Sequence, residues 1–113
     1  MVRNERINRF VMMVVGDDYE DLAMIHDEVV RLATEEAVIP PPTRSEILAE
    51  LTKLVDRGHV KAYILSTTEP TKEIQLPRSE GIVQVPESND RRTGCYFLLT
   101  EDGLRFFREL PAS

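Results

Sequence analysis

The feature that most constrains this chain is the order helix, strand, strand, helix in its second half. Thr43-Arg44-Ser45-Glu46 fits a capping box, in which the threonine hydroxyl and the glutamate carboxylate each accept from the other residue's backbone amide. Apolar residues then recur at helical spacing up to Gly58, which suits the left-handed residue that ends many helices. The sequence predicts a helix over 43–58. Its inner face would carry Ile47, Leu48, Leu51, Leu54 and Val55, and its outer face Arg44, Glu46, Ala49, Glu50, Lys53 and Arg57.

Two apolar segments after that helix have the composition of strands. Residues 60–65 follow Gly58 almost directly, and residues 95–99 come just before Thr100. We expect these segments to pair antiparallel, with Thr100 capping a final helix that bears Leu104, Phe107 and Leu110. The stretch between them, 66–94, is polar and punctuated by proline and glycine, and within it only Ile82-Val83-Gln84-Val85 resembles a strand.

The first half of the chain predicts two further helices. Asn4 is a candidate cap for a helix over about 5–15, because Ile7, Phe10, Val11 and Val14 fall at helical spacing. A buried strand from Phe10 to Val15 is the alternative, and the spacing back to Ile7 favours the helix. Asp17 and Asp18 precede a second helix that runs to about residue 34. Three consecutive prolines then make 34–42 an extended, stiff connector.

The motifs of the second half resemble those of a known family. Residues 47–60, ILAELTKLVDRGHV, and residues 96–103, YFLLTEDG, look like bacterial winged-helix transcriptional regulators of the MarR and PadR type. The resemblance covers 43–110, and the first 40 residues match only in helix count. It implies a helix-dominated α+β fold, a winged helix-turn-helix with four helices and a small antiparallel hairpin as the wing. One domain would span 1–113, with N-terminal helices in 1–39, a recognition helix in 43–58, a wing in 60–99 and a last helix in 100–110.

In that family the exposed face of the third helix enters the DNA major groove and the wing tip lies along phosphates. Carried onto this chain, the resemblance implies contacts from Arg44, Ser45, Ala49 and Lys53, with Arg91 and Arg92 in the wing. The chain departs from the family pattern in its longer connector and its larger wing. Glu46 and Glu50, expected on the same outer face, would also oppose an approach to phosphates.

The charge distribution restricts where a nucleic acid could bind. The formal net charge is −6, which opposes long-range attraction to a polyanion. Residues 1–39 hold four arginines against nine acids, whereas residues 40–65 hold four cations against three acids. Any DNA site would therefore be a local basic patch, with the Arg91-Arg92-Thr93-Gly94 cluster as the best candidate.

Nothing in the composition favours an enzyme, a metal site or a membrane span. His26 and His59 lie on different predicted elements, and Cys95, the only cysteine, has no neighbouring histidine, so we expect no catalytic residue, metal or cofactor. One cysteine forms no intrachain disulfide. The longest apolar run, Phe10 to Val15, is far short of the roughly 20 residues that cross a bilayer. A soluble, cytoplasmic protein is expected.

Two functions follow from these observations. The first is a DNA-binding transcriptional regulator that acts on double-stranded DNA as a homodimer, with Phe10, Val11 and Val14 at the interface between copies. The alternative is a winged-helix protein-interaction module that does not bind nucleic acid and uses its acidic first half or its long wing as the contact surface.

Overall fold

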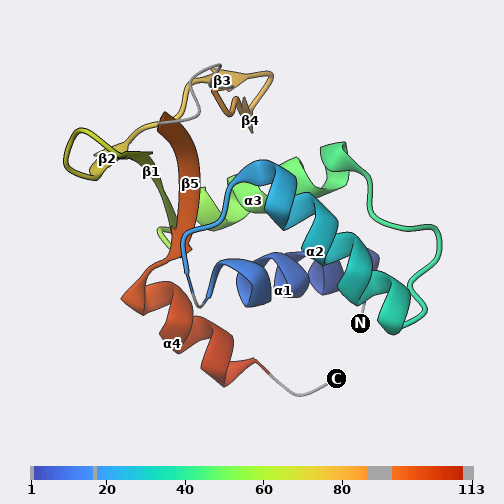
Figure 1. Ribbon diagram of the computed structural model, residues 1–113. Helices are drawn as coiled ribbons and strands as arrows, with labels where there is room; N and C mark the ends of the chain where they lie inside the picture. The colour runs from blue at the N-terminus through green and yellow to red at the C-terminus, as the bar shows by residue number, and fades with distance from the viewer. Residues whose placement is uncertain (1, 17, 87–92, 111–113) are drawn as a thin grey trace.

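The computed structural model describes residues 2–16, 18–86 and 93–110 as an α+β fold with a small antiparallel sheet (Figure 1). The helices of these residues are α1 (Arg3–Val15), α2 (Leu22–Glu35), α3 (Arg44–Asp56) and α4 (Glu101–Glu109). The strands are β1 (Val60–Ser66), β2 (Lys72–Ile74), β3 (Arg78–Ser79), β4 (Ile82–Val83) and β5 (Thr93–Leu99). The predicted fold class is confirmed at this level, as four helices and an antiparallel sheet.

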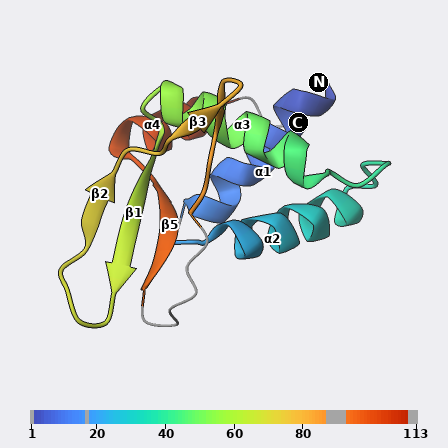
Figure 2. The same cartoon turned by 90° about the horizontal axis from the view of Figure 1, so that it is seen from above.

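The sheet pairs the two segments that the sequence predicted to be partners. β1 and β5 run antiparallel from Val60 opposite Leu99 to Ser66 opposite Thr93. β2 adds to the other side of β1, so the strand order is β2-β1-β5, and β3 and β4 form a separate two-stranded hairpin. Figure 2 shows the three-stranded sheet at one end of the molecule and the helices α1, α2 and α3 at the other. β2 and β3 were not predicted, because their short polar sequences carry no alternating pattern.

A single bridge joins the link between α1 and α2 to the free side of β5. The Glu20 amide donates to the Phe97 carbonyl over 3.0 Å, and the Phe97 amide donates to the Glu20 carbonyl over 2.8 Å. Glu20 is therefore paired with the edge of β5 that does not face β1, as a single residue of an additional strand would be. The chain that leads into α2 is thereby tied to the strand that leads into α4.

The apolar segment near the N-terminus is helical, as predicted. α1 packs against both α2 and α3, and Phe10, Val11 and Val15 are fully or almost fully buried. Two predicted starts were wrong. α1 begins after Val2, which has no capping side chain, so Asn4 lies inside the helix. α2 is capped by Asp21, whose carboxylate accepts from the Met24 amide, three residues after Asp18.

The connector after α2 is not helical, as its prolines predicted. α2 ends at Glu35, and Ala37 takes a positive φ of 56°, which turns the chain away from the helix axis. Val38 is then buried, and its amide donates to the Ala33 carbonyl. Thr43 starts α3 with the predicted capping box, and Gly58 has the expected left-handed conformation with φ of 75°. These residues fix both ends of α3.

The end of α3 and the start of α4 meet at a tight junction. The Thr100 hydroxyl accepts from the Gly103 amide and donates to the Gly58 carbonyl, and the Thr100 amide donates to the His59 carbonyl. Gly103 is buried directly against that same His59 carbonyl. No side chain fits between the two backbones, so the glycine of the LTEDG motif is required by packing.

We predict that Gly103→Ala destabilises the fold. Alanine favours a helix over glycine by about 1 kcal/mol, so propensity predicts a gain in stability. A Cβ at this position would meet the His59 carbonyl oxygen and a Leu99 methyl group well inside van der Waals distance. We expect a net loss of about 2–4 kcal/mol in the free energy of unfolding, measured by urea denaturation. The exposed helical variant Ser45→Ala should change it by less than about 0.5 kcal/mol, and a Gly103→Ala variant as stable as the wild type would contradict the packing argument.

Candidate functional site

The exposed side of α3 carries cations and a small hydroxyl. Arg44, Ser45, Lys53 and Arg57 are exposed, and Ala49 is partly exposed, so the predicted α3 contact residues lie at the surface. Figure 1 shows α3 leading directly toward β1, with α1 on its inner side. What this surface offers to a partner depends on where the two glutamates of the helix point.

Glu50 was predicted on the outer face, and this was wrong. It is only 4% exposed and lies on the side of α3 that faces α1. The Asn8 side-chain amide donates to Glu50 Oε1 over 3.4 Å, and Lys53 Nζ lies 2.8 Å from Glu50 Oε2. A buried carboxylate needs such partners, because an unpaired charge away from water is costly. The spacing could have indicated this, since Glu50 falls three residues after Ile47 and four before Leu54.

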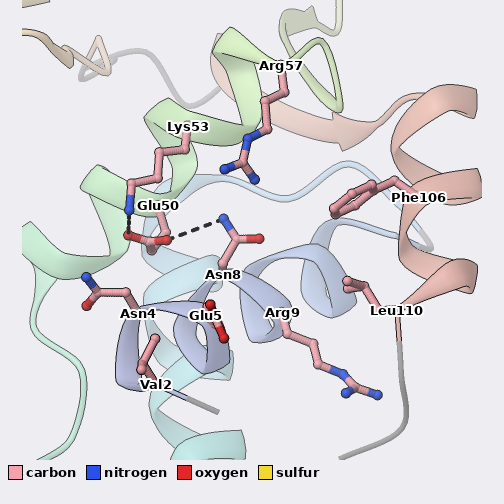
Figure 3. Close-up of a pocket in the computed structure, with 10 residues that line it drawn as sticks. All are labelled: Val2, Asn4, Glu5, Asn8, Arg9, Glu50, Lys53, Arg57, Phe106 and Leu110. Atoms are coloured by element: carbon pink, nitrogen blue, oxygen red, sulfur yellow. Dashed lines mark hydrogen bonds and ion pairs between the residues drawn. The ribbon is translucent and has the colours of Figure 1, made fainter.

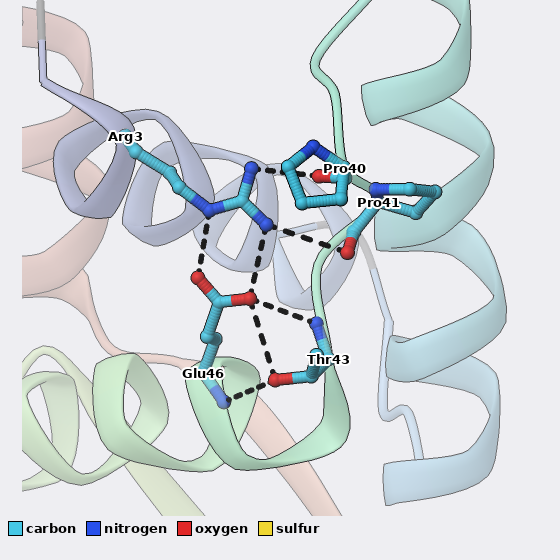
Figure 4. Close-up of polar contacts among 5 residues, drawn as sticks. All are labelled: Arg3, Pro40, Pro41, Thr43 and Glu46. Atoms are coloured by element: carbon cyan, nitrogen blue, oxygen red, sulfur yellow. Dashed lines mark hydrogen bonds and ion pairs between the residues drawn. The ribbon is translucent and has the colours of Figure 1, made fainter.

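Glu46 is half-buried and is bound by the N-terminal helix (Figure 4). Arg3 donates to both Glu46 carboxylate oxygens, over 2.7 and 3.0 Å, and also to the carbonyls of Pro40 and Pro41. The same carboxylate accepts from the Thr43 amide. The Arg3 hydrogen bond, with help from that amide, lowers the pKa of Glu46 to about 2. One arginine thus joins α1, the connector and the first turn of α3.

The two glutamates are therefore not available to oppose an anionic partner. Both are turned toward cations or amides, and the surface of α3 that remains exposed presents Arg44, Lys53 and Arg57. The sequence predicted a nearly neutral outer face. In the structure the exposed face of α3 is more positive than that, because Glu46 and Glu50 are turned toward their partners. Composition alone does not say in which direction a side chain points.

The β3–β4 hairpin covers one flank of α3. Thr52 is buried, and its hydroxyl accepts from the Val83 amide over 3.1 Å while donating to the Leu48 carbonyl. Val83 is 1% exposed, and Arg78 forms an ion pair with Asp56 at the end of the helix. Part of the polar segment that the resemblance assigned to the wing therefore packs on α3.

A pocket of about 580 Å³ opens beside α3, between α1 and α4 (Figure 3). Arg57, which directly follows α3, points into this space, toward Asn8 of α1 and the Phe106 ring of α4. Sequence reasoning missed this pocket. The sequence feature that could have indicated the pocket is Asn8, a polar residue on the otherwise apolar buried face of α1. Nothing in the sequence indicated that α4 lies beside this face. The lining residues are Val2, Asn4, Glu5, Asn8, Arg9, Glu50, Lys53, Arg57, Phe106 and Leu110.

The remaining predicted site residues have different outcomes. Arg91 and Arg92 lie outside the described residues. Phe10 and Val11 are 2% and 0% exposed, so they belong to the chain's own core and have no surface to offer a second copy. This corrects their assignment to an interface, while Val14 is partly buried. Homodimer formation itself stays a prediction.

The groups with possible catalytic chemistry are dispersed. His59 stacks on Phe106 with ring centroids 4.6 Å apart, whereas His26 lies on α2 near Asp27. Cys95 is buried in β5, and burial raises the pKa of its thiol to about 11. Within residues 2–16, 18–86 and 93–110, no three His, Cys, Asp or Glu side chains are grouped so that they could hold a metal ion.

No family model, curated protein or solved structure matches this chain. The described helices are also too short or too polar for any of them to cross a bilayer. The candidate site therefore rests on the chemistry and placement of its own residues.

We predict that Arg3→Met lowers stability in a pH-dependent way. The pKa of Glu46 is depressed in the folded state, so its contribution to stability is present above the ordinary carboxyl pKa and is lost as pH falls toward about 2. In urea denaturation, the free energy of unfolding of Arg3→Met should fall furthest below that of the wild type at neutral pH. In acid this difference should shrink to the part that comes from the Arg3 hydrogen bonds to the Pro40 and Pro41 carbonyls. Arg44→Met, on the exposed end of α3, is the matched control and should show little change. A difference that is constant from pH 7 to pH 2.5 would contradict the ion-pair account.

We predict that the Cys95 thiol is unreactive in the folded protein. At a pKa of about 11, roughly one thiol in a thousand is ionised at pH 8, and burial also blocks access. The disulfide reagent DTNB should react slowly with native protein and within seconds to minutes in urea. Fast reaction without urea would show that β5 is exposed.

Proposed function

We propose that this chain is a winged-helix DNA-binding protein that uses α3 as its recognition helix. The observation that carries the proposal is the inward orientation of Glu46 and Glu50. With both acids paired, Arg44 and Ser45 are side chains that α3 offers to a duplex, together with Lys53, which is exposed although it also pairs with Glu50. Arginine and lysine bind phosphates or guanine edges, and serine donates to either.

The order of the elements supports the winged-helix arrangement. α3 leads through Gly58 into β1, and β1 pairs antiparallel with β5 from Val60 opposite Leu99 to Ser66 opposite Thr93. Glu20 adds the bridge on the other side of β5. Arg91 and Arg92 directly precede β5 in the sequence. In this proposal they contact the phosphate backbone next to the groove that α3 occupies.

The overall negative charge sets a condition on this function. With a net charge of −6 the molecule as a whole is repelled by a duplex, so binding depends on the local cations of α3 and of the segment before β5. One copy supplies few phosphate contacts, and two copies on adjacent half-sites would supply twice as many. We therefore propose that DNA is bound by a homodimer.

A protein-interaction module is the second candidate, and one surface favours it. Met13 and Met24 are 40% and 47% exposed, and they line the same groove between α1 and α2 as Glu20 and Glu28. Flexible methionine side chains suit binding surfaces that adapt to a partner. The β3–β4 hairpin also reduces the part of α3 that a groove could receive.

Fluorescence anisotropy with duplex DNA at two salt concentrations tests the proposal. The association constant should fall steeply as salt is added. A plot of its logarithm against the logarithm of the salt concentration should have a slope of about −0.9 for each phosphate contacted. Arg44→Ala and the double variant Arg91→Ala with Arg92→Ala should each weaken binding, and the slope should drop by about one for each phosphate contact removed. Arg31→Ala is the matched control, because this arginine lies on α2 and pairs with Glu28 and Glu35.

The outcomes separate the two candidate functions. Loss of affinity in the α3 and wing variants, with Arg31→Ala unchanged, supports DNA binding through the proposed surface. If no duplex binds even at low salt, DNA binding is wrong and the interaction module stands. Equal effects of Arg31→Ala and Arg44→Ala would place the contact elsewhere on the molecule.

A further inference from the structure

The pocket between α1, α3 and α4 has the size of a small-molecule site. Its volume of about 580 Å³ lies within the roughly 300–1,000 Å³ that such sites span. Three helices supply its walls, and the junction of Thr100 and Gly103 with Gly58 and His59 holds two of them, α3 and α4, in place. The pocket is thus built from fixed elements.

One wall of the pocket is a fully partnered polar group. The Glu50 side chain is 5% exposed and is held by Asn8 and Lys53. Because its charge is already compensated, Glu50 positions its neighbours more than it attracts a cation. Figure 3 shows both hydrogen-bond partners of Glu50 on the side of the pocket away from Phe106.

Arg57 is the group that can receive a ligand. Its guanidinium points into the pocket (Figure 3), and no residue in the described parts of the chain is hydrogen-bonded or ion-paired to it. A guanidinium presents several N–H donors in one plane, which matches a carboxylate or a phosphate. An anionic group is therefore the chemistry that fits this position.

Apolar side chains complete the opposite side. Phe106 is 37% exposed, which places it among the exposed large apolar residues, and Leu110 lies on the same side of the pocket (Figure 3). His59 stacks against Phe106 and so holds the ring in place. An apolar body placed here would remove exposed hydrophobic surface from water.

We propose that this pocket binds a small organic anion. Its charged group would lie against Arg57 and the Asn8 amide, and its apolar body against Phe106 and Leu110. Lys53 lies on α3 and Arg57 directly follows that helix, so the ligand site adjoins the surface proposed to meet DNA. The ligand site does not depend on that function, and its test contains no DNA.

Nuclear magnetic resonance titration with matched six-carbon probes tests the site. Hexanoate, hexyl phosphate, hexylamine and hexanol share an apolar chain and differ in the charge of the head group. Hexanoate should shift the side-chain signals of Asn8 and Arg57 and the backbone signal of Leu110 in a saturable way, with a dissociation constant of about millimolar for so small a ligand. Hexanol and hexylamine should bind at least about fivefold more weakly. Tighter binding of hexyl phosphate than of hexanoate would support the site and assign its head group to the phosphate class.

Two variants and one control identify the residues. Arg57→Gln, which keeps a polar side chain but removes the guanidinium charge, should weaken hexanoate binding by at least about fivefold. Leu110→Ser should weaken hexanoate and leave the weak binding of acetate unchanged. Arg44→Gln removes a cation from the same helix outside the pocket and should have no effect. The proposal is overturned if hexanoate causes no saturable shifts, if hexylamine binds as well as hexanoate, or if Arg57→Gln binds hexanoate like the wild type.

Discussion

The contact between the Gly103 backbone and the His59 carbonyl is the constraint on which the second half of the molecule depends. It sets how closely the start of α4 approaches the end of α3, and the hydroxyl of Thr100 fixes the same two segments by hydrogen bonds. β1 must leave this junction and β5 must return to it, so their register follows from it. The pocket between α3 and α4 exists because a glycine and a threonine occupy these two positions.

The sequence predicted the parts of the fold that local chemistry determines. The capping box at Thr43, the left-handed Gly58 and the pairing of residues 60–65 with 95–99 were all confirmed. The start of α1 was predicted less well, because the helix begins after Val2 without a capping side chain. The start of α2 was hard to place because several acids precede it and the sequence does not say which one caps the helix. β2 and β3 are strands because a partner lies beside them, and such a partner leaves no trace in a short polar segment.

The candidate site shows a different limit of sequence reasoning. The identities of Arg44, Ser45 and Lys53 as exposed residues of α3 were predictable from helical spacing. The directions of Glu46 and Glu50 were not, because they depend on Arg3 and Asn8, which lie about forty residues earlier in the chain. A net charge summed along a segment treats all these groups alike. In the folded chain Glu46 and Glu50 are paired with side chains on or beside α1 and α3, while Arg44 and Lys53 remain exposed.

The β3–β4 hairpin has a consequence for the entropy of the long segment between β1 and β5. A loop of that length has many conformations, and holding its two ends together restricts only some of them. The bonds from Val83 to Thr52 and from Arg78 to Asp56 fix the middle of the segment on α3 as well. Because β2 is also paired with β1, the segment between β1 and β5 is held at more than one point along its length. Each such contact removes conformations that a single long loop would have, so the entropy lost in bringing β1 and β5 together is shared among shorter closures.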